Sequence, residues 1–292
     1  MKTLPDRVHA AALPDVRGLR IPERTLALLR DLIASQAGMH YDDGRLDILR
    51  ERIVPLAIER GFDSLLDYYY LLKYDTAATG EWPRVMDALS VQETYFWRES
   101  DHLKALATTI IPRLVERHRR TIRIWSIPCA SGEEPLSIAM ALNEAGAFHA
   151  ANIEIHASDG SDAALAKAQS RRYGRRSFRQ LPDDLQARYF TRVPGKEEWI
   201  VDDDLFARVN SWTRVNLVNP AEISGLASCD VIFCRNVFIY FTPSCIREVA
   251  LNFSRSMPSP GYLCVGAAES LLKAGAGFDL QELGGAYVYV KQ

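Results

Sequence analysis

The sequence lacks the features that membrane-spanning and nucleic-acid-binding proteins need. No apolar run approaches the ~20 residues that cross a bilayer, and the polar start MKTLPDRVHA does not have the pattern of a signal peptide. The formal net charge of −2 gives no bulk electrostatic attraction to nucleic acid. We therefore expect a cytoplasmic protein that neither inserts into a membrane nor binds nucleic acid.

Patterns of metal and dinucleotide sites are missing as well. The 5 cysteines form no CxxC pair, and the 6 histidines show no ligand spacing near them. Because several cysteines lie in apolar, strand-like runs, we predict reduced core residues and no metal centre. No GxGxxG follows any strand, which disfavours a nicotinamide dehydrogenase.

What is present is typical of a globular protein with two domains. The chain has 292 residues, of which 48% are hydrophobic and 25% charged. Residues 1–20 show little periodicity and are predicted to be a flexible leader. Residues 21–90 have helical periodicity with polar or glycine-bearing breaks, which predicts a small helical domain.

Two glycines and a proline mark helix ends in this domain. Gly38 and Gly61 stand where C-terminal caps belong, and Pro83 fits the first turn of a helix that Glu81 opens. Pro55 is a candidate interruption of the helix that begins near Gly44. We expect four helices in this part of the chain.

The second predicted helix carries arginines beside an apolar stripe. The stripe is Leu46, Leu49, Ile53 and Leu56, and the arginines are Arg45, Arg50, Arg52 and Arg60. One interpretation is a solvated charged face. The other is a docking surface for an acidic helical partner. The intervening acids weaken the second interpretation.

Residues 91–120 are predicted to be a linker followed by a connecting helix. The linker, VQETYFWRE, places aromatic side chains beside acids and an arginine. Tyr95, Phe96 and Trp97 have a simple interpretation as a hydrophobic junction. Arg98 does not, because an arginine among aromatics needs an anionic partner or a ligand.

The segment IWSIPCASGEEPLSIAMAL is predicted to be a strand, a tight loop and a helix. Two carboxylates, Glu133 and Glu134, stand where a pyrophosphate would need bare backbone amides. They are either first-turn acids favoured by the helix dipole, or one of them contacts a ligand that is cationic or carries hydroxyls. S-adenosylmethionine, with its sulfonium, ammonium and ribose hydroxyls, fits that ligand better than NAD does.

Downstream, polar residues end several apolar strands. Asp159 closes the strand NIEIHASD, where it is suited to bind ribose hydroxyls, to cap the next helix, or both. Arg235 and Asn236 follow the buried strand Val231 to Phe233, at the edge where open α/β sheets bind ligands. In about 190–214, WIV, LFARV and WTRVNL are predicted as short strands of a small antiparallel insertion.

The alternation of strands and helices in residues 121–292, closed by a hairpin at Gly284-Gly285, is the pattern of a Rossmann-like, class I methyltransferase domain. Blocks VQETYFWRE, WSIPCASGEEPLSIAM, VNL, DVIFCRNVFIYF and AAES occur in this order. With them the chain resembles the chemotaxis receptor methyltransferases, the CheR family of protein-glutamate O-methyltransferases, over nearly everything beyond Ile21. The resemblance implies an α/β methyltransferase domain with a small antiparallel β-subdomain, preceded by a helical domain.

The resemblance also implies site residues. S-adenosylmethionine would be bound by Gln92, Thr94, Arg98, Glu134, Asp159, Asn216, Leu217, Arg235 and Asn236. Arg98 and Tyr240 would face the methyl group as catalytic residues. Gln92, Trp97, Leu136 and Gly160 depart from the family's usual residues, which indicates a somewhat divergent member.

The implied reaction is methyl transfer from S-adenosylmethionine to glutamate carboxylates of chemoreceptors, giving methyl ester and S-adenosylhomocysteine. Two alternatives stay open: another protein or small carboxylate as acceptor, and a non-catalytic module that binds the cofactor. The β-subdomain is a candidate dock for a receptor C-terminal peptide by strand addition. Without long coiled-coil heptads, we expect a monomer.

Overall fold

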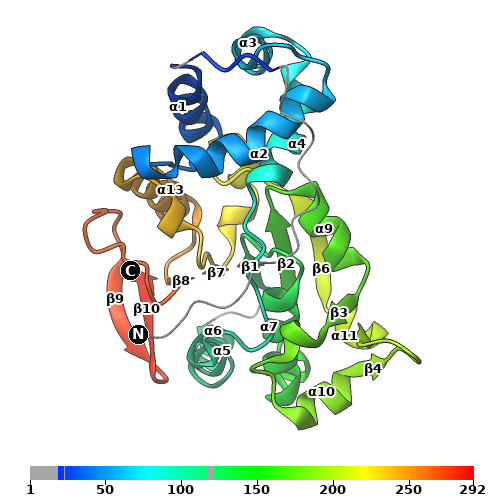
Figure 1. Cartoon of the computed structure of the whole chain (residues 1–292). Coiled ribbons are helices and arrows are strands. Elements are labelled where there is room, and N and C mark those ends of the chain that lie inside the picture. Colours follow the sequence, from blue (N-terminus) through cyan, green and yellow to red (C-terminus); the bar gives the residue numbers. More distant parts are fainter. Residues whose placement is uncertain (1–18, 23, 118–120) are drawn as a thin grey trace, which may run out of the picture. The chain divides into compact units, whose positions relative to one another are not determined.

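The computed structural model of the chain describes residues 19–22, 24–117 and 121–292 (Figure 1). The predicted leader lies outside the described residues except for its last two positions. The described chain forms two compact units. The first takes in the described residues up to Ser35 together with 40–89, and the second comprises 36–39 with the rest of the chain from Ser90.

The first unit is helical, as the periodicity predicted. Its α-helices are α1 (Thr25–Ala37), α2 (Leu46–Glu59), α3 (Leu65–Tyr74) and α4 (Ala78–Leu89), with a short 3₁₀ turn at Asp43–Arg45. Gly38 and Gly61 follow α1 and α2 with φ of 72° and 77°, which confirms the predicted caps. The prediction for Pro83 was wrong, because α4 begins at Ala78 and contains the proline, and Pro55 does not interrupt α2.

A buried carboxylate organises the core of the first unit. Glu81 is 1% exposed and accepts hydrogen bonds from the Tyr68 hydroxyl at 2.8 Å and from Arg84 at 3.2 Å. Arg60 pairs with the other oxygen of Glu81 at 2.8 Å. Desolvation, followed by the Glu81 contact, raises the pKa of Tyr68. A carboxylate can be buried here because each of its oxygens has a partner.

Two of the four arginines predicted beside the apolar stripe of the second helix bind groups within the first unit. Arg60 is held by Glu81, and Arg52 donates to the Ala88 carbonyl at 2.8 Å. Arg45 lies 3.7 Å from Asp42, and Arg50 is exposed. Two of the four arginines therefore serve the helical unit itself, and Arg45 and Arg50 are left as candidates for a docking role.

The second unit is built on a seven-stranded sheet with spatial order β6-β2-β1-β7-β8-β10-β9. β1 pairs in parallel with β2 and β7, β2 with β6, and β7 with β8, while β10 runs antiparallel to β8 and β9. Among the first five of these strands the chain order across the sheet is 3-2-1-4-5, a Rossmann-like order closed by a hairpin. The predicted fold class is thus confirmed. The strands are β1 (Ile122–Ser126), β2 (Ile153–Asp159), β6 (Val209–Arg214), β7 (Val231–Phe233), β8 (Gly261–Cys264), β9 (Asp279–Leu283) and β10 (Ala286–Lys291).

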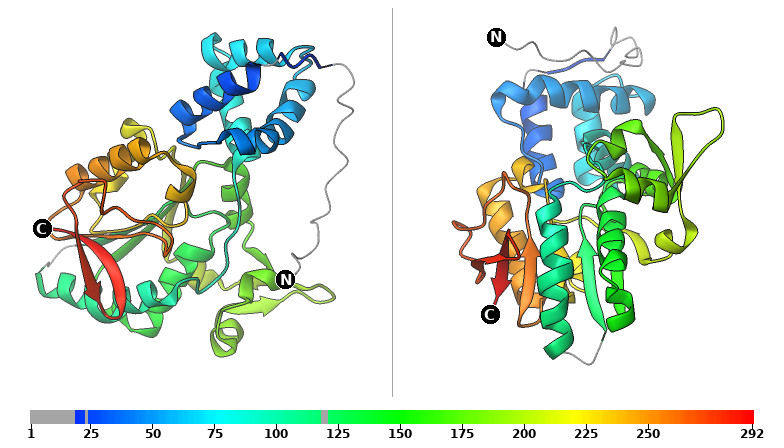
Figure 2. Two further views of the ribbon diagram at one scale, coloured as in Figure 1. Left: turned by 60° about the vertical axis from the view of Figure 1, so that its left-hand side comes forward. Right: turned by 90° about the horizontal axis from the view of Figure 1, so that it is seen from below.

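Both faces of the sheet are buried, because alternate strand residues enter different apolar clusters. Val231 and Phe233 pack into one cluster, whereas Ile232 packs into the other. The first cluster is covered by α5, α6 and α7, and the second by α12 and α13; Figure 2 shows these two groups on opposite sides of the sheet. The α-helices of this unit are α5 (Ser100–Ala105), α6 (Ile111–Arg117), α7 (Glu133–Glu144), α8 (Ala147–Ala150), α9 (Asp162–Gln169), α10 (Asp183–Tyr189), α11 (Asp203–Phe206), α12 (Pro220–Ile223) and α13 (Pro243–Ser256).

The predicted connecting helix is present as one run with a π-helical middle, Leu106–Ile110, between α5 and α6. All five cysteines are free, and four of them are buried, as predicted for core residues. Among the described residues, no helix is both long and apolar enough to cross a bilayer.

The small antiparallel sheet exists, but its strands differ from those expected. It has the order β3-β5-β4, with β3 (Arg172–Gly174), β5 (Glu198–Val201) and β4 (Phe190–Arg192). The expected LFARV strand does not form, because Leu205 and Phe206 end α11, residues 207–208 form a turn and Val209 begins β6. The Asp202 side chain caps α11 by accepting from two backbone amides. The WTRVNL segment begins in β6, which belongs to the main sheet. Alternating apolar residues predicted strands here without revealing which sheet each would join.

Candidate active site

The candidate site lies beyond the carboxyl ends of β1 and β7, at the loop that connects β1 to α7. The connecting loop passes through Ala130 and Gly132, both with positive φ, of 46° and 94°. A Cβ on Gly132 would lie 3.0 Å from the Trp212 ring and 3.1 Å from Ala168. Glycine is needed at this position for its conformation and for the close packing of α7 against neighbouring elements.

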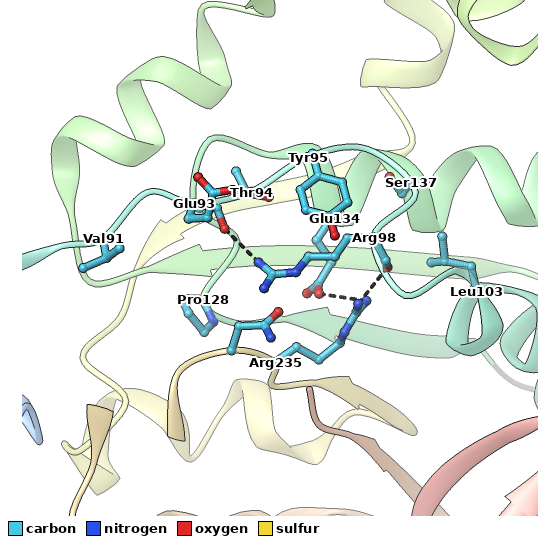
Figure 3. Close-up of a pocket in the computed structure, with 12 residues that line it drawn as sticks. Val91, Glu93, Thr94, Tyr95, Arg98, Leu103, Pro128, Glu134, Ser137 and Arg235 are labelled. Atoms are coloured by element: carbon cyan, nitrogen blue, oxygen red, sulfur yellow. Dashed lines mark hydrogen bonds and ion pairs between the residues drawn. The ribbon is translucent and has the colours of Figure 1, made fainter. Parts of the chain in front are cut away.

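A pocket opens at this edge of the sheet (Figure 3). It encloses a cavity of about 60 Å³. Because small-molecule sites are typically several hundred Å³, a cavity of this size holds one polar end of a ligand. The lining residues come from the linker 91–98, α5, the β1–α7 loop, α7 and the end of β7: Val91, Glu93, Thr94, Tyr95, Arg98, Leu103, Pro128, Ala130, Glu134, Ser137, Arg235 and Asn236.

Arg235 is the buried cation of this pocket. Its side chain is 2% exposed, and its two terminal nitrogens lie 3.2 Å from carboxylate oxygens of Glu134 and Glu99. One of these nitrogens also donates to the Arg98 carbonyl at 2.7 Å. Its Nε has no hydrogen-bond partner among the described residues. A buried guanidinium with a spare donor is suited to hold an anionic or acceptor group of a ligand.

Glu134 contributes the pocket's negative charge. It stands in the first turn of α7 and accepts a hydrogen bond from the buried Ser126 hydroxyl at 2.7 Å. Burial raises the pKa of Glu134, although Arg235 and the Ser126 hydrogen bond act in the opposite direction. Its side chain is still 15% exposed toward the pocket, so it can meet a cationic group.

Arg98 is held by its own linker. Its Nη1 donates to the Glu93 carbonyl at 2.8 Å, and its guanidinium lies 5.4 Å from the centre of the Tyr95 ring. The guanidinium of Arg179 stacks on the same ring at 3.7 Å and pairs with the Glu93 carboxylate. Figure 3 shows Glu134 and Arg235 meeting in the pocket, and the Arg98 guanidinium directed toward the Glu93 carbonyl. The arginine that the sequence could not explain as core therefore lines the pocket.

The aromatic linker has both of the roles that were considered for it. Phe96 is fully buried against Tyr173, Phe178 and Phe190. Tyr95 and Arg98 line the pocket instead. The packed phenylalanine thereby anchors the segment that presents the arginine.

The backbone around the pocket is unusually strained. Trp97, Glu99, Ala130 and Asn236 have positive φ, of 66°, 51°, 46° and 60°, and only Arg171 shares this property among the other described non-glycine residues. Such conformations cost of order 1–3 kcal/mol each and cluster at functional sites. Their concentration here supports a functional role independently of the pocket itself.

Asp159 lies at the end of β2 but not in the lining of the pocket. Its carboxylate accepts from the Ala130 amide at 2.8 Å and from the Ser161 amide at 2.9 Å. Ser161, in turn, caps α9 with its hydroxyl. The Asp159 side chain therefore supports the β1–α7 loop, and a role toward a ribose stays a prediction.

Four other predicted residues lie outside the pocket. Gln92 is exposed on the linker. Asn216 and Leu217 follow β6, where the Asn216 side chain accepts from the Val218 amide and donates to the Gln36 carbonyl at 2.7 Å. Tyr240 ends a 3₁₀ turn, Phe238–Tyr240, and packs against the cluster under α13. The structure thus joins Thr94, Arg98, Glu134, Arg235 and Asn236 in the pocket. It leaves Asp159, Asn216 and Leu217 at neighbouring strand ends, and Gln92 and Tyr240 on the linker and the 3₁₀ turn.

Sequence reasoning missed several residues that build the site. Glu133 is not a solvent-exposed first-turn acid, because it is 1% exposed and accepts from the Ser131 and Ser177 hydroxyls at 2.7 and 2.9 Å. Glu269 accepts from the amides of Asn236, Phe238, Ile239 and Gly266, and so shapes the loop that carries Asn236 and Tyr240. A carboxylate closing an apolar strand was the available signal for Glu269. No local signal marked the partners of Glu133.

The donor and acceptor set of this pocket fits one end of an S-adenosylmethionine molecule. Glu134 can accept from an ammonium, while Arg98 and the spare Nε of Arg235 can donate to a carboxylate. The described residues contain no group of three potential ligands arranged to hold a metal ion.

Comparison with known proteins identifies the two units. The family model described as "CheR methyltransferase, SAM binding domain" matches residues 92–283, and "CheR methyltransferase, all-alpha domain" matches residues 24–90. Together the two matched ranges cover most of the chain.

Curated relatives agree over nearly the full length. Chemotaxis protein methyltransferase 2 of Vibrio cholerae is 33% identical over 275 residues, covering 93% of this chain and 94% of that protein. The chemotaxis protein methyltransferase of Borreliella burgdorferi is 27% identical, covering 87% and 90%. Chemotaxis protein methyltransferase 1 of Pseudomonas aeruginosa is 28% identical, covering 84% and 89%.

The chain belongs to the CheR methyltransferase family and contains its SAM-binding domain. The resemblance read from the sequence motifs is confirmed.

Proposed function

We propose that this CheR-family methyltransferase transfers a methyl group from S-adenosylmethionine to glutamate side-chain carboxylates of chemoreceptors in the cytoplasm. The observation that carries the proposal is the convergence of Arg98, Glu134 and Arg235 in one pocket at the carboxyl edge of the sheet. Relatives named as chemotaxis protein methyltransferases support the choice of acceptor.

Cofactor binding is proposed to use the pocket and the adjoining strand ends. Glu134, Arg235 and Asn236, with Thr94 and Arg98, would hold the methionine part. Asp159, Asn216 and Leu217, at the ends of β2 and β6, would hold the ribose and adenine, and Gln92 would contribute from the linker. Asp159 accepts from the Ala130 and Ser161 amides, so a ribose would share this carboxylate with the β1–α7 loop.

The proposed reaction requires little acid–base catalysis by the protein. The cofactor supplies an electrophilic methyl group on a sulfonium: a carboxylate oxygen forms the new bond to this carbon as the carbon–sulfur bond breaks, giving methyl ester and S-adenosylhomocysteine. A glutamate acceptor is already ionised at neutral pH, so no general base is needed. The task of the chain is to align the acceptor and exclude water.

Two side chains are assigned to that task. Arg98 keeps donors available beyond its bond to the Glu93 carbonyl, and would orient the incoming carboxylate. Tyr240, on the turn that Glu269 shapes, would lie beside the reacting methyl group.

Acceptor recognition is proposed to involve the exposed charges of the first unit. Arg45 and Arg50 on and before α2 suit an acidic receptor helix. The three-stranded sheet offers β3 and β4 as edges to which a receptor C-terminal peptide could add. The enzyme is proposed to act as a monomer.

The test is incubation of the full chain with labelled S-adenosylmethionine and chemoreceptor-containing membranes, followed by assay of base-labile methyl ester and peptide mass spectrometry of the receptors. We expect methyl esters on receptor glutamates. Esters confined to other proteins or small acids would indicate a different acceptor, and cofactor binding without any transfer would indicate a regulatory module. Unchanged turnover in Arg98→Ala and Tyr240→Phe would refute the assigned roles.

A further inference from the structure

The linker that presents Arg98 continues with a carboxylate, Glu99, to which neither the motif resemblance nor the proposed reaction assigns a role. We propose that Glu99 is a positioning residue that neutralises Arg235 and thereby leaves Glu134 available for the ammonium group of the cofactor. This inference rests on the proposed function, because it concerns the same cofactor site.

Glu99 ties together the segments that follow β7 and β8. Its Oε2 lies 3.2 Å from the buried guanidinium of Arg235 and accepts from the Ala267 amide at 3.2 Å. Its Oε1 accepts from the Asn236 side-chain amide at 3.4 Å. Both Arg235 and Asn236 line the pocket. Glu99 therefore contacts the pocket's cation and one of its polar residues from outside the lining.

The backbone conformation of the linker orients the Glu99 side chain toward Arg235. Trp97 and Glu99 have φ of 66° and 51°, on either side of Arg98. For residues that carry a Cβ, this conformation is unfavourable and persists only where surrounding contacts enforce it. The Trp97 amide donates to the Ser137 hydroxyl at 3.0 Å, and the Glu99 carboxylate makes the contacts described above. With this backbone Arg98 lines the pocket, and the Glu99 carboxylate lies 3.2 Å from Arg235 and 4.0 Å from the Arg98 Nε.

Charge balance explains why the cofactor site would need Glu99. Arg235 is 2% exposed and has two carboxylate partners, Glu99 and Glu134. A buried cation requires compensation, so loss of the Glu99 charge would leave Glu134 as its sole carboxylate partner. Glu134 would then be held more tightly in an internal ion pair and would be a poorer acceptor for a ligand ammonium.

The test compares Glu99→Gln with the unaltered full chain by calorimetry with S-adenosylhomocysteine, which carries the same ammonium and carboxylate as the cofactor. We expect the Kd to rise about tenfold to a hundredfold, the range for losing a hydrogen bond to a charged group. The KM for S-adenosylmethionine should rise in parallel, with a much smaller change in kcat. Glu99→Asp, which keeps the charge but shortens its reach, should recover part of the affinity and serves alone if Glu99→Gln does not fold.

Asp101→Asn is the matched control, because Asp101 is an exposed carboxylate two residues further along, and we expect wild-type affinity. The double variant Glu99→Gln/Glu134→Gln should lose less affinity than the two single losses combined, since both act on Arg235. Wild-type Kd in folded Glu99→Gln, or a lowered Tm with unchanged Kd, would overturn the positioning role. Retained binding of S-adenosylhomocysteine with no receptor methylation would overturn the proposed function alone.

Discussion

The pocket and the three-stranded sheet use the same residue types in opposite ways. In the pocket, Arg235 is 2% exposed and shares two carboxylates. On the small sheet, Arg172 pairs with Glu198 at 3.0 Å, but these side chains are 46% and 32% exposed. Water screens the second pair and makes it weak, whereas the first has no solvent to replace a lost partner. The comparison teaches that burial decides which arginine is indispensable.

The sharpest way to break this contrast is Arg235→Met, which keeps the bulk of the side chain and removes its charge. Glu99 and Glu134 would lose the buried cation that they share, and breaking a buried pair typically costs about 3–5 kcal/mol. We expect a loss of that order in urea-induced unfolding, and no measurable binding of S-adenosylhomocysteine by calorimetry. Wild-type stability with retained binding would show that the cluster is not a coupled unit.

Neighbouring carboxylates offer a narrower version of the comparison. Glu134→Gln should weaken S-adenosylhomocysteine binding about tenfold to a hundredfold, because a charged acceptor is lost. Glu133→Gln should instead lower the free energy of unfolding by about 1–2 kcal/mol while affinity stays within about twofold, since the Glu133 carboxylate accepts from the Ser131 and Ser177 hydroxyls and does not line the pocket. Calorimetry measures the Kd of both variants, and urea unfolding measures their free energies of unfolding. Equal affinity losses would contradict the separation of roles.

The pH dependence of binding tests the buried state of Glu134. Burial raises the pKa of this carboxyl, so its ionised, ammonium-binding form is complete only above the raised value. We expect S-adenosylhomocysteine affinity to fall with decreasing pH, and this fall to begin at a higher pH than the ordinary pKa of a glutamate would give. The pH dependence should be absent in Glu134→Gln. For folding the sign is opposite: the native state takes up this proton first, so this carboxyl makes the protein more stable as pH falls through the raised pKa.

The smallest effect is expected on the exposed sheet. Arg172→Ala removes the partner of Glu198 where water can take its place, and exposed pairs are worth roughly 0–1 kcal/mol. Urea unfolding should change by no more than that, and S-adenosylhomocysteine affinity should not change. A loss comparable to that of Arg235→Met would erase the distinction between the two regions.

Local patterns were sufficient for most of the elements. Helical periodicity predicted α1 to α4, and Gly38 and Gly61 marked helix ends because glycine tolerates positive φ. Apolar strands ending in Asp159 and Arg235 predicted a ligand edge. The errors were at Pro83, which lies inside α4, and in the LFARV and WTRVNL segments. In LFARV a side-chain cap favoured a helix, and WTRVNL joined the main sheet, because local propensity does not reveal the partner of a strand.

The sequence by itself determined the family and most of the elements, and it predicted that Arg98, Glu134 and Arg235 belong to the site, because these follow from motifs and periodicity along the chain. Tertiary structure alone decided what each charge does. It assigned Glu133 to two serine hydroxyls and Glu134 to the pocket, and it brought Glu99 to Arg235 across 135 intervening positions. The physical reason is that burial and pairing depend on neighbours that are distant in sequence, and these set whether a charge is screened, shared or free to bind.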